Sequence, residues 1–260
     1  EVARGALAVA LVAACIWTCM RTYDAPDALH LPFVAVWLLA AALAFAWNSR
    51  VAAHLVAIAV LPWWIATSLR FEFDGAQPSF VLANGAALLF GAGLAIAAAP
   101  SPRALRLGTV LSIYGAFSLA VVAFLEVTTV DDIIRFRTGS APAQPLWAIL
   151  CGAAGVILAL ASAGITKRAG EILAGCSIGL ALLAAPLWPV STAGEPWFAY
   201  AALLCAMLSL VVSGMLDDVR PRIVAGWLGI AGVIAGITWA VKGSLLRRSA
   251  FLAAAGVIAV

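Results

Sequence analysis

The chain has 260 residues, of which 65% are hydrophobic and only 10% are charged, and its formal net charge is +3. Together with a mean hydropathy of +1.10, this composition excludes a water-soluble globular domain. Only helices and closed barrels satisfy backbone polar groups in lipid, and the apolar runs lack the polar alternation of barrel strands. We therefore predict an all-α polytopic membrane bundle in which residues 1–260 form a single transmembrane domain with no soluble domain.

Apolar runs broken by charges, prolines and glycine clusters mark the expected transmembrane helices. A bilayer core of about 30 Å requires about 20 residues of helix. We predict nine complete spans and a partial tenth, arranged as helical hairpins. In chain order they cover residues 5–20, 31–47, 51–69, 79–99, 104–125, 146–165, 170–188, 197–216, 223–241 and 249 onward.

The two ends of the chain raise an expectation and an alternative. Because the first residue is Glu1 and the last, Val260, falls inside an apolar run, we expect both ends to be truncated. Residues 12–15, Val-Ala-Ala-Cys, also match a bacterial lipoprotein cleavage box. Against that alternative, the residues after Cys15 stay apolar, whereas a processed lipoprotein turns polar at this point.

A weak repeat organises the spans into hairpins. Four helix pairs open with a proline close to an aromatic residue, and proline suits the first helical turn because its missing N–H would be unpaired there anyway. Each pair then turns at a short basic loop. The four openings are Pro32-Phe33, Pro78-Ser79-Phe80, Pro145-Leu146-Trp147 and Pro196-Trp197. When the chain is aligned with itself, Ser49-Arg50-Val51 pairs with Pro221-Arg222-Ile223.

The positive-inside rule indicates an orientation. If the chain starts in the cytoplasm, eight cations fall on that side: Arg4, Arg50, Arg103, Arg106, Lys167, Arg168, Arg220 and Arg222. Seven fall on the other side, and three of these belong to "KGSLLRR", whose following span is incomplete: Arg21, Arg70, Arg135, Arg137, Lys242, Arg247 and Arg248. Without that segment the balance favours a cytoplasmic start. We predict a multi-pass protein of a bacterial inner membrane.

Two similar stretches, "DDIIRFR" (131–137) and "DDVRPR" (217–222), each set an aspartate pair ahead of two arginines. They are separated by an odd number of predicted spans, so we expect them on opposite membrane faces and not in one site. Adjacent aspartates also point to different sides of a helix and do not form the carboxylate group that a magnesium ion needs. We interpret "DDVRPR" as a solvated turn, and "DDIIRFR" as a connector or an interfacial docking segment.

The five cysteines, Cys15, Cys19, Cys151, Cys176 and Cys205, all lie in apolar runs without a CxxC pair. This pattern indicates packing residues and not a disulfide framework or a thiolate metal site. We expect no metal, no cofactor and no catalytic residue.

Four residues are candidates for ligand binding: Asn84, Trp63, Trp64 and His54. An amide several residues inside a span needs a partner in hydrocarbon, so Asn84 is either a hydrogen-bonding residue between helices or a ligand contact. Trp63 and Trp64 follow a proline whose kink could line a small apolar cavity. His54 is expected at headgroup level, as is Glu126, the acid closest to a span interior.

Three runs carry a resemblance to a known family: "RGALAVALVAACIWTCMRT", "HLPFVAVWLLAAALAFAWNSRVAAHLVAIAVLPWWIATSL" and "GWLGIAGVIAGITWAVKGSLLRRSAFLAAAGVIAV". In these runs the chain resembles bacterial membrane proteins of the domain of unknown function 2157 family. The resemblance implies a cytosolic segment and further spans ahead of Glu1. It brings no catalytic residue and no substrate.

The sequence favours a non-catalytic scaffold or binding protein for a lipid, an apolar small molecule or a membrane partner. A transporter is the alternative, supported by the hairpin repeat and weakened by the lack of charges at the centres of the spans. A lipid-active enzyme comes third. The expected partners are the lipid bilayer and other membrane proteins or further copies of the chain, and not nucleic acid.

Overall fold

The computed structural model describes residues 48–70, 78–128, 146–187 and 197–240, together with residues 38, 40–44 and 46. Within these residues it contains helices and turns and no strand, which confirms the all-α prediction. The helices with described bounds are α3 (Arg50–Arg70), α4 (Pro78–Ala97), α5 (Pro102–Thr128), α7 (Leu146–Thr166), α8 (Ala169–Leu187), α9 (Trp197–Leu216) and α10 (Arg220–Ala240).

These seven helices match seven predicted spans with ends that differ by a few residues. The predicted count of nine complete spans is not supported, because the described residues contain fewer. The predicted span 31–47 is described only in part, as helical residues between 38 and 46, and the spans 5–20 and 249 onward lie outside the described residues.

The described bundle is membrane-embedded. Four of its helical segments are long and apolar enough to cross a bilayer: Pro102–Val127, Leu146–Thr166, Phe198–Leu216 and Arg220–Thr238. Two further apolar segments, Val81–Ala97 and Ala169–Ala184, are shorter. Many large apolar side chains on the outside of the bundle are exposed, such as Leu150 on α7 and Leu228 on α10, as expected where lipid takes the place of water.

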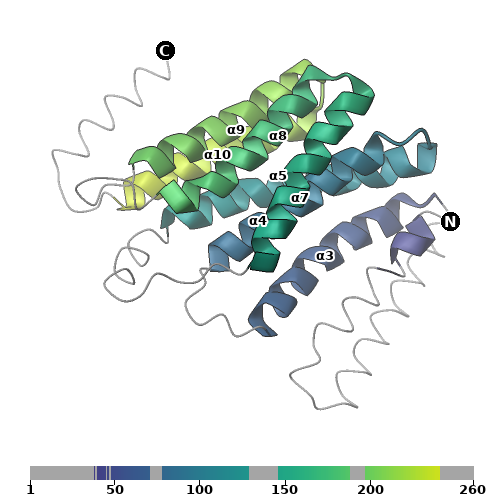
Figure 1. Cartoon of the computed structure of the whole chain (residues 1–260), viewed down its shortest axis with the longest axis horizontal. Helices are drawn as coiled ribbons and strands as arrows, with labels where there is room; N and C mark the ends of the chain where they lie inside the picture. The colour runs from purple at the N-terminus through teal and green to yellow at the C-terminus, as the bar shows by residue number, and fades with distance from the viewer. Residues whose placement is uncertain are drawn as a thin grey trace.

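Helices α4 and α5 lie in the middle of the bundle (Figure 1). Helix α4 packs against α5 and α7, and α5 also packs against α10, while α8 and α9 complete the larger part of the core. Phe90, Leu119 and Met207 are fully buried there. A second, smaller core joins α3 to α4 and α5 around Val56 and Leu111.

Small residues bring the helices together. Alanine is the most frequent buried residue, and several glycines stand where a Cβ atom would overlap the backbone of a neighbour. Gly91 of α4 meets the backbone of Gly155 of α7, and Gly93 meets Ser112 of α5. Because lipid chains are as apolar as leucine, helices in a membrane associate through such close van der Waals packing. Gly91 and Gly93 thus allow α4 to pack closely against two helices.

Gly175 with Gly179, and Gly232 with Gly236, have the GxxxG spacing that predicts close helix packing, and the structure gives the two pairs different surroundings. Gly232 and Gly236 of α10 pack against Phe124 and Val127 of α5, as expected. In α8, Gly175 packs against Leu160, but a Cβ atom on Gly179 would have no neighbour within 4 Å. The packing interpretation is therefore wrong for Gly179.

The basic loops share one end of the bundle, which we call the basic end. There α3, α5, α8 and α10 begin, and α4, α7 and α9 end. Arg106 Nη1 of α5 donates to the carbonyl oxygen of Asn48 at 2.6 Å, ahead of α3. Gly170 of α8 lies against the Asp217 carboxyl group, next to α10. These contacts join turns that are distant in sequence.

Three turns at the basic end have the same local geometry. Asn48, Lys167 and Asp218 have left-handed backbone conformations, with φ of 52°, 56° and 54°. Each stands two positions ahead of the first residue of the next helix, at Arg50, Ala169 and Arg220. This shared geometry supports the hairpin repeat. It makes Asn48 equivalent to Asp218, whereas the sequence alignment pairs Ser49 with Pro221. The sequence alignment is therefore shifted by two residues from the structural one.

Candidate functional site

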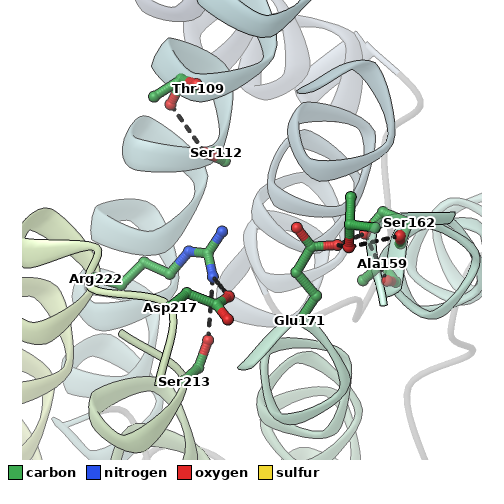
Figure 2. Close-up of polar contacts among 9 residues, drawn as sticks. Thr109, Ser112, Ala159, Ser162, Glu171, Ser213, Asp217 and Arg222 are labelled. Atoms are coloured by element: carbon green, nitrogen blue, oxygen red, sulfur yellow. Dashed lines mark hydrogen bonds and ion pairs between the residues drawn. The ribbon is translucent and has the colours of Figure 1, made fainter. Parts of the chain in front are cut away.

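Two neighbouring hydrogen-bonded groups lie at the basic end, and together we call them the polar cluster. Glu171 bonds to Ser162 and Thr166, and Arg222 bonds to Ser213 and Asp217; Figure 2 labels these residues apart from Thr166. The two groups meet where Gly170 lies against the Asp217 carboxyl group. They come from the α7–α8 and α9–α10 hairpins. Charged side chains are rarely found inside a membrane protein without a specific role, so this cluster is the candidate functional site.

Arg222 and Asp217 form an ion pair within the α9–α10 hairpin. Arg222 Nη1 lies 2.8 Å from Asp217 Oδ2, and the two side chains are only 5% and 3% exposed. The same nitrogen donates to Ser213 Oγ at 3.3 Å, and the guanidinium carbon lies 6.0 Å from the centroid of the Phe90 ring on α4. Among the described residues, the buried Nε of Arg222 has no hydrogen-bond partner. The pair therefore links the hairpin to α4, and one guanidinium donor has no acceptor among the described residues.

The backbone of the α9–α10 turn positions this pair. Val219 N–H donates to the Gly214 carbonyl at 2.8 Å, and Arg222 N–H donates to the Val219 carbonyl at 3.0 Å. Asp218 adopts the left-handed conformation that Asp and Asn tolerate best among residues other than glycine. Pro221 stands in the first turn of α10, where its missing N–H is harmless. The turn directs Asp217 and Arg222 inward and leaves Asp218 exposed.

Glu171 lies in the first turn of α8 and is 3% exposed. Its Oε2 accepts hydrogen bonds from Ser162 Oγ at 2.7 Å and from Thr166 Oγ1 at 2.8 Å, both on α7. A carboxylate near a helix N-terminus is favoured by the helix dipole. In its described contacts Glu171 accepts from neutral hydroxyl groups, whereas Asp217 pairs with the cationic Arg222.

Both hydroxyl groups have a second acceptor within reach. Ser162 Oγ lies 2.8 Å from the Ala159 carbonyl, and Thr166 Oγ1 lies 3.0 Å from the Ser162 carbonyl. A hydroxyl group has one proton to donate, so each must choose between the carboxyl group and the helix backbone. The Glu171 carboxyl group and the carbonyl groups of α7 therefore compete as acceptors for the same two hydroxyl groups.

The interpretation of "DDVRPR" as a solvated turn is wrong for Asp217, whose side chain is buried beside Arg222 and Gly170. It is right for Asp218, which is exposed. The physical reason is that Asp217 directly follows α9 and its N–H still donates to the Ser213 carbonyl, while Asp218 turns the chain away in the left-handed conformation. The companion stretch 131–137 lies outside the described residues.

Two of the four sequence candidates lie close together near the opposite end. Asn84 is 2% exposed, and its Oδ1 stands where a Cβ atom on Gly152 of α7 would be. Trp64 packs against Gly85, donates from Nε1 to the Val81 carbonyl at 2.7 Å, and meets Trp147 edge-on with ring centroids 5.2 Å apart. Asn84 therefore lies between two helices, α4 and α7, and Trp64 joins α3 to both of them.

Of the other two candidates, His54 lies apart from this group. His54 is exposed near the basic end, where its Nδ1 lies 3.3 Å from the Tyr114 hydroxyl group of α5. Trp63 lies in α3, but its side chain is outside the described part of the structure. Glu126, expected at headgroup level, is buried at 2% exposure in the last turns of α5. The four candidates thus do not form one site.

Sequence reasoning missed the polar cluster. Ser162 and Thr166 are four residues apart on α7, and Glu171 follows after a two-residue turn, a pattern that could have indicated a hydroxyl–carboxylate contact. The described residues contain no group of three or more His, Cys, Asp or Glu side chains that could hold a metal ion. No family model, no curated protein and no solved structure matches this chain.

Proposed function

We propose that the protein is a non-catalytic helical scaffold or binding protein of the membrane, for a lipid, an apolar small molecule or a membrane partner. The observation that supports the proposal is how the buried polar groups are used. Arg222 bonds to Asp217 and Ser213, and Glu171 bonds to Ser162 and Thr166, so these groups connect neighbouring helices of the same bundle. The close contact of Gly91 with Gly155 adds rigidity to the centre.

A transporter is the second candidate, because the polar cluster places two carboxyl groups and an arginine in the interior. Buried ionisable residues in membrane helices often serve proton or ion movement. Glu171 in particular is a buried carboxyl group whose described contacts are to the hydroxyl groups of Ser162 and Thr166 and not to a cation. It is the residue at which the two functions give different experimental outcomes.

Proteoliposomes test the choice. The full chain is reconstituted into liposomes that contain a pH-sensitive dye, and a pH gradient or a potassium diffusion potential is imposed. For a scaffold we expect proton flux equal to that of protein-free liposomes, before and after Glu171→Gln. Flux that requires the protein and disappears in Glu171→Gln would replace the scaffold proposal by the transporter. Ser162→Ala, which removes one hydroxyl contact and keeps the carboxyl group, is the matched control.

We further propose that the membrane is a bacterial inner membrane and that the basic end faces the cytoplasm, which is supported by the gathering of Arg50, Arg103, Lys167 and Arg220 at that end. Ser101, in the α4–α5 turn, offers a test because Ser101→Cys changes neither charge nor helix. In a cysteine-free background, an impermeant maleimide should label this cysteine only after the cells are opened. Full labelling of intact, outer-membrane-permeabilised cells would reverse the orientation.

The resemblance to the domain of unknown function 2157 family remains a prediction from the quoted apolar runs. It is compatible with the scaffold proposal, since it brings no catalytic residue.

A further inference from the structure

The cations of the basic end divide into two groups. Arg106 donates a hydrogen bond to the Asn48 carbonyl oxygen, and Arg222 forms an ion pair with Asp217. Five others are exposed, and no acidic side chain of the described residues forms an ion pair with them: Arg50, Arg103, Lys167, Arg168 and Arg220. Asp218 is the exposed acid among the described residues at this end. The surface of the basic end is therefore strongly positive.

Lys167 and Arg168 are the only adjacent pair among these five, and they form the whole turn between α7 and α8. The left-handed conformation of Lys167 ends α7 sharply, so that both side chains stand at the rim of the bundle. Two cations at neighbouring positions can both contact one anionic group.

Below the pair, α7 presents a continuous apolar face to the outside. Only 33% of its span is buried inside the bundle. Ile165, Ile157 and Leu150 are exposed by 65%, 65% and 60%. Near the turn, a Cβ atom on Gly164 would meet nothing within 4 Å, so there is open space beside Ile165. The face runs the full length of a 21-residue helix, which at 1.5 Å per residue crosses about 30 Å.

We propose that the α7–α8 turn binds the headgroup of an anionic phospholipid, with Lys167 and Arg168 at the phosphate and an acyl chain along the outer face of α7. Charge complementarity decides the occupant: an apolar face capped by two exposed cations, with no paired acid among the described residues, matches a molecule with an anionic head and an apolar tail. A helix of another protein would match the apolar face but would leave the two cations unused. The inference holds whether the bundle is a scaffold or a transporter.

Lipid binding to the purified full chain in detergent tests the site. Phosphatidylglycerol and phosphatidylcholine are titrated separately, and bound lipid is measured by native mass spectrometry. Each Lys or Arg near an anionic lipid surface contributes about 1 kcal/mol, which corresponds to about fivefold in affinity. The double variant Lys167→Gln/Arg168→Gln should therefore bind phosphatidylglycerol about 25-fold more weakly, with phosphatidylcholine binding unchanged. Inorganic phosphate at millimolar concentration should not displace the lipid, because it has no tail.

The matched control is Arg50→Gln/Arg103→Gln, which removes the same charge from the same end and leaves the α7–α8 turn intact. It should change phosphatidylglycerol affinity less than threefold, and both double variants should keep the melting temperature of the parent protein. Equal loss in the two variants would show that general positive charge is sufficient and would overturn the site. So would equal binding of the two lipids by the parent protein.

A second copy of the chain is the competing occupant of the α7 face. Ile157→Cys in a cysteine-free background places a thiol at the centre of that face. Under the lipid proposal, mild oxidation in native membranes should leave the protein monomeric on a gel, as for Ala225→Cys, a buried position on α10. Efficient formation of a disulfide-linked dimer through Ile157→Cys would show that α7 is covered by protein and would overturn the proposal.

Discussion

Replacing Asp217 by alanine should lower the free energy of unfolding in detergent by about 3–5 kcal/mol, because it leaves the buried guanidinium of Arg222 without its counter-charge. The measurement is the midpoint of unfolding in increasing SDS, followed by helical circular dichroism. The size of the effect contrasts with the 0–1 kcal/mol expected for a charge in a solvated turn.

Two further variants identify the cause. Asp218→Ala changes the neighbouring carboxyl group, which is exposed, and should alter stability by less than about 1 kcal/mol. The double variant Asp217→Ala/Arg222→Met removes both charges and should recover most of the loss, since a buried ion pair can often be replaced by apolar residues with little cost. If the double variant is no more stable than Asp217→Ala, the loss does not arise from the unpaired charge.

Gly155→Leu should be the most disruptive single change at the centre of the bundle. Even a Cβ atom at this position would overlap the backbone of Ala87, and Gly155 itself lies against Gly91. A leucine must therefore move α4 away from α7. Overpacking a core costs about 1–3 kcal/mol where side chains can adjust, and we expect at least the upper value because the obstacle is backbone. Thermal unfolding in detergent measures the loss.

Helix α7 supplies its own control at Gly164, where a Cβ atom would meet no neighbour within 4 Å. Gly164→Leu introduces the same side chain into the same helix and should leave the melting temperature unchanged or slightly raised, because leucine has the better helix propensity. Similar losses in the two variants would indicate that α7 does not pack against α4 as described.

The helices were predictable from the sequence because hydropathy alone sets their positions. The apolar runs end at charges and prolines, and α9 begins and ends at the residues expected from them. The total number of spans was not supported, and the contacts between helices were not predictable. Nothing in the composition indicates that α4 lies beside α7 while also packing on its sequence neighbour α5.

The candidate site illustrates a different difficulty. Asn84 was recognisable because an amide stands out within an apolar run, and the structure places it at a helix contact. The burial of Asp217 and Glu171 was not recognisable. In a sequence, a carboxyl group at the end of a span is interpreted as solvated, whether its side chain turns outward or inward. That direction depends on the left-handed conformation of Asp218 and on the hydroxyl groups of α7, which are separate features of the chain.

The direction of the α4–α7 contact has a consequence for how the protein is made. Both helices run toward the basic end, so they lie parallel, and parallel neighbours cannot be joined by a short turn. During synthesis α4 enters the bilayer well before α7 has been translated. The face of α4 that carries Gly91 must therefore remain against lipid, another helix or the insertion machinery until Gly155 arrives. Assembly thus includes one obligatory late docking step, and a chain released after α5 would insert with the packing face of α4 still uncovered.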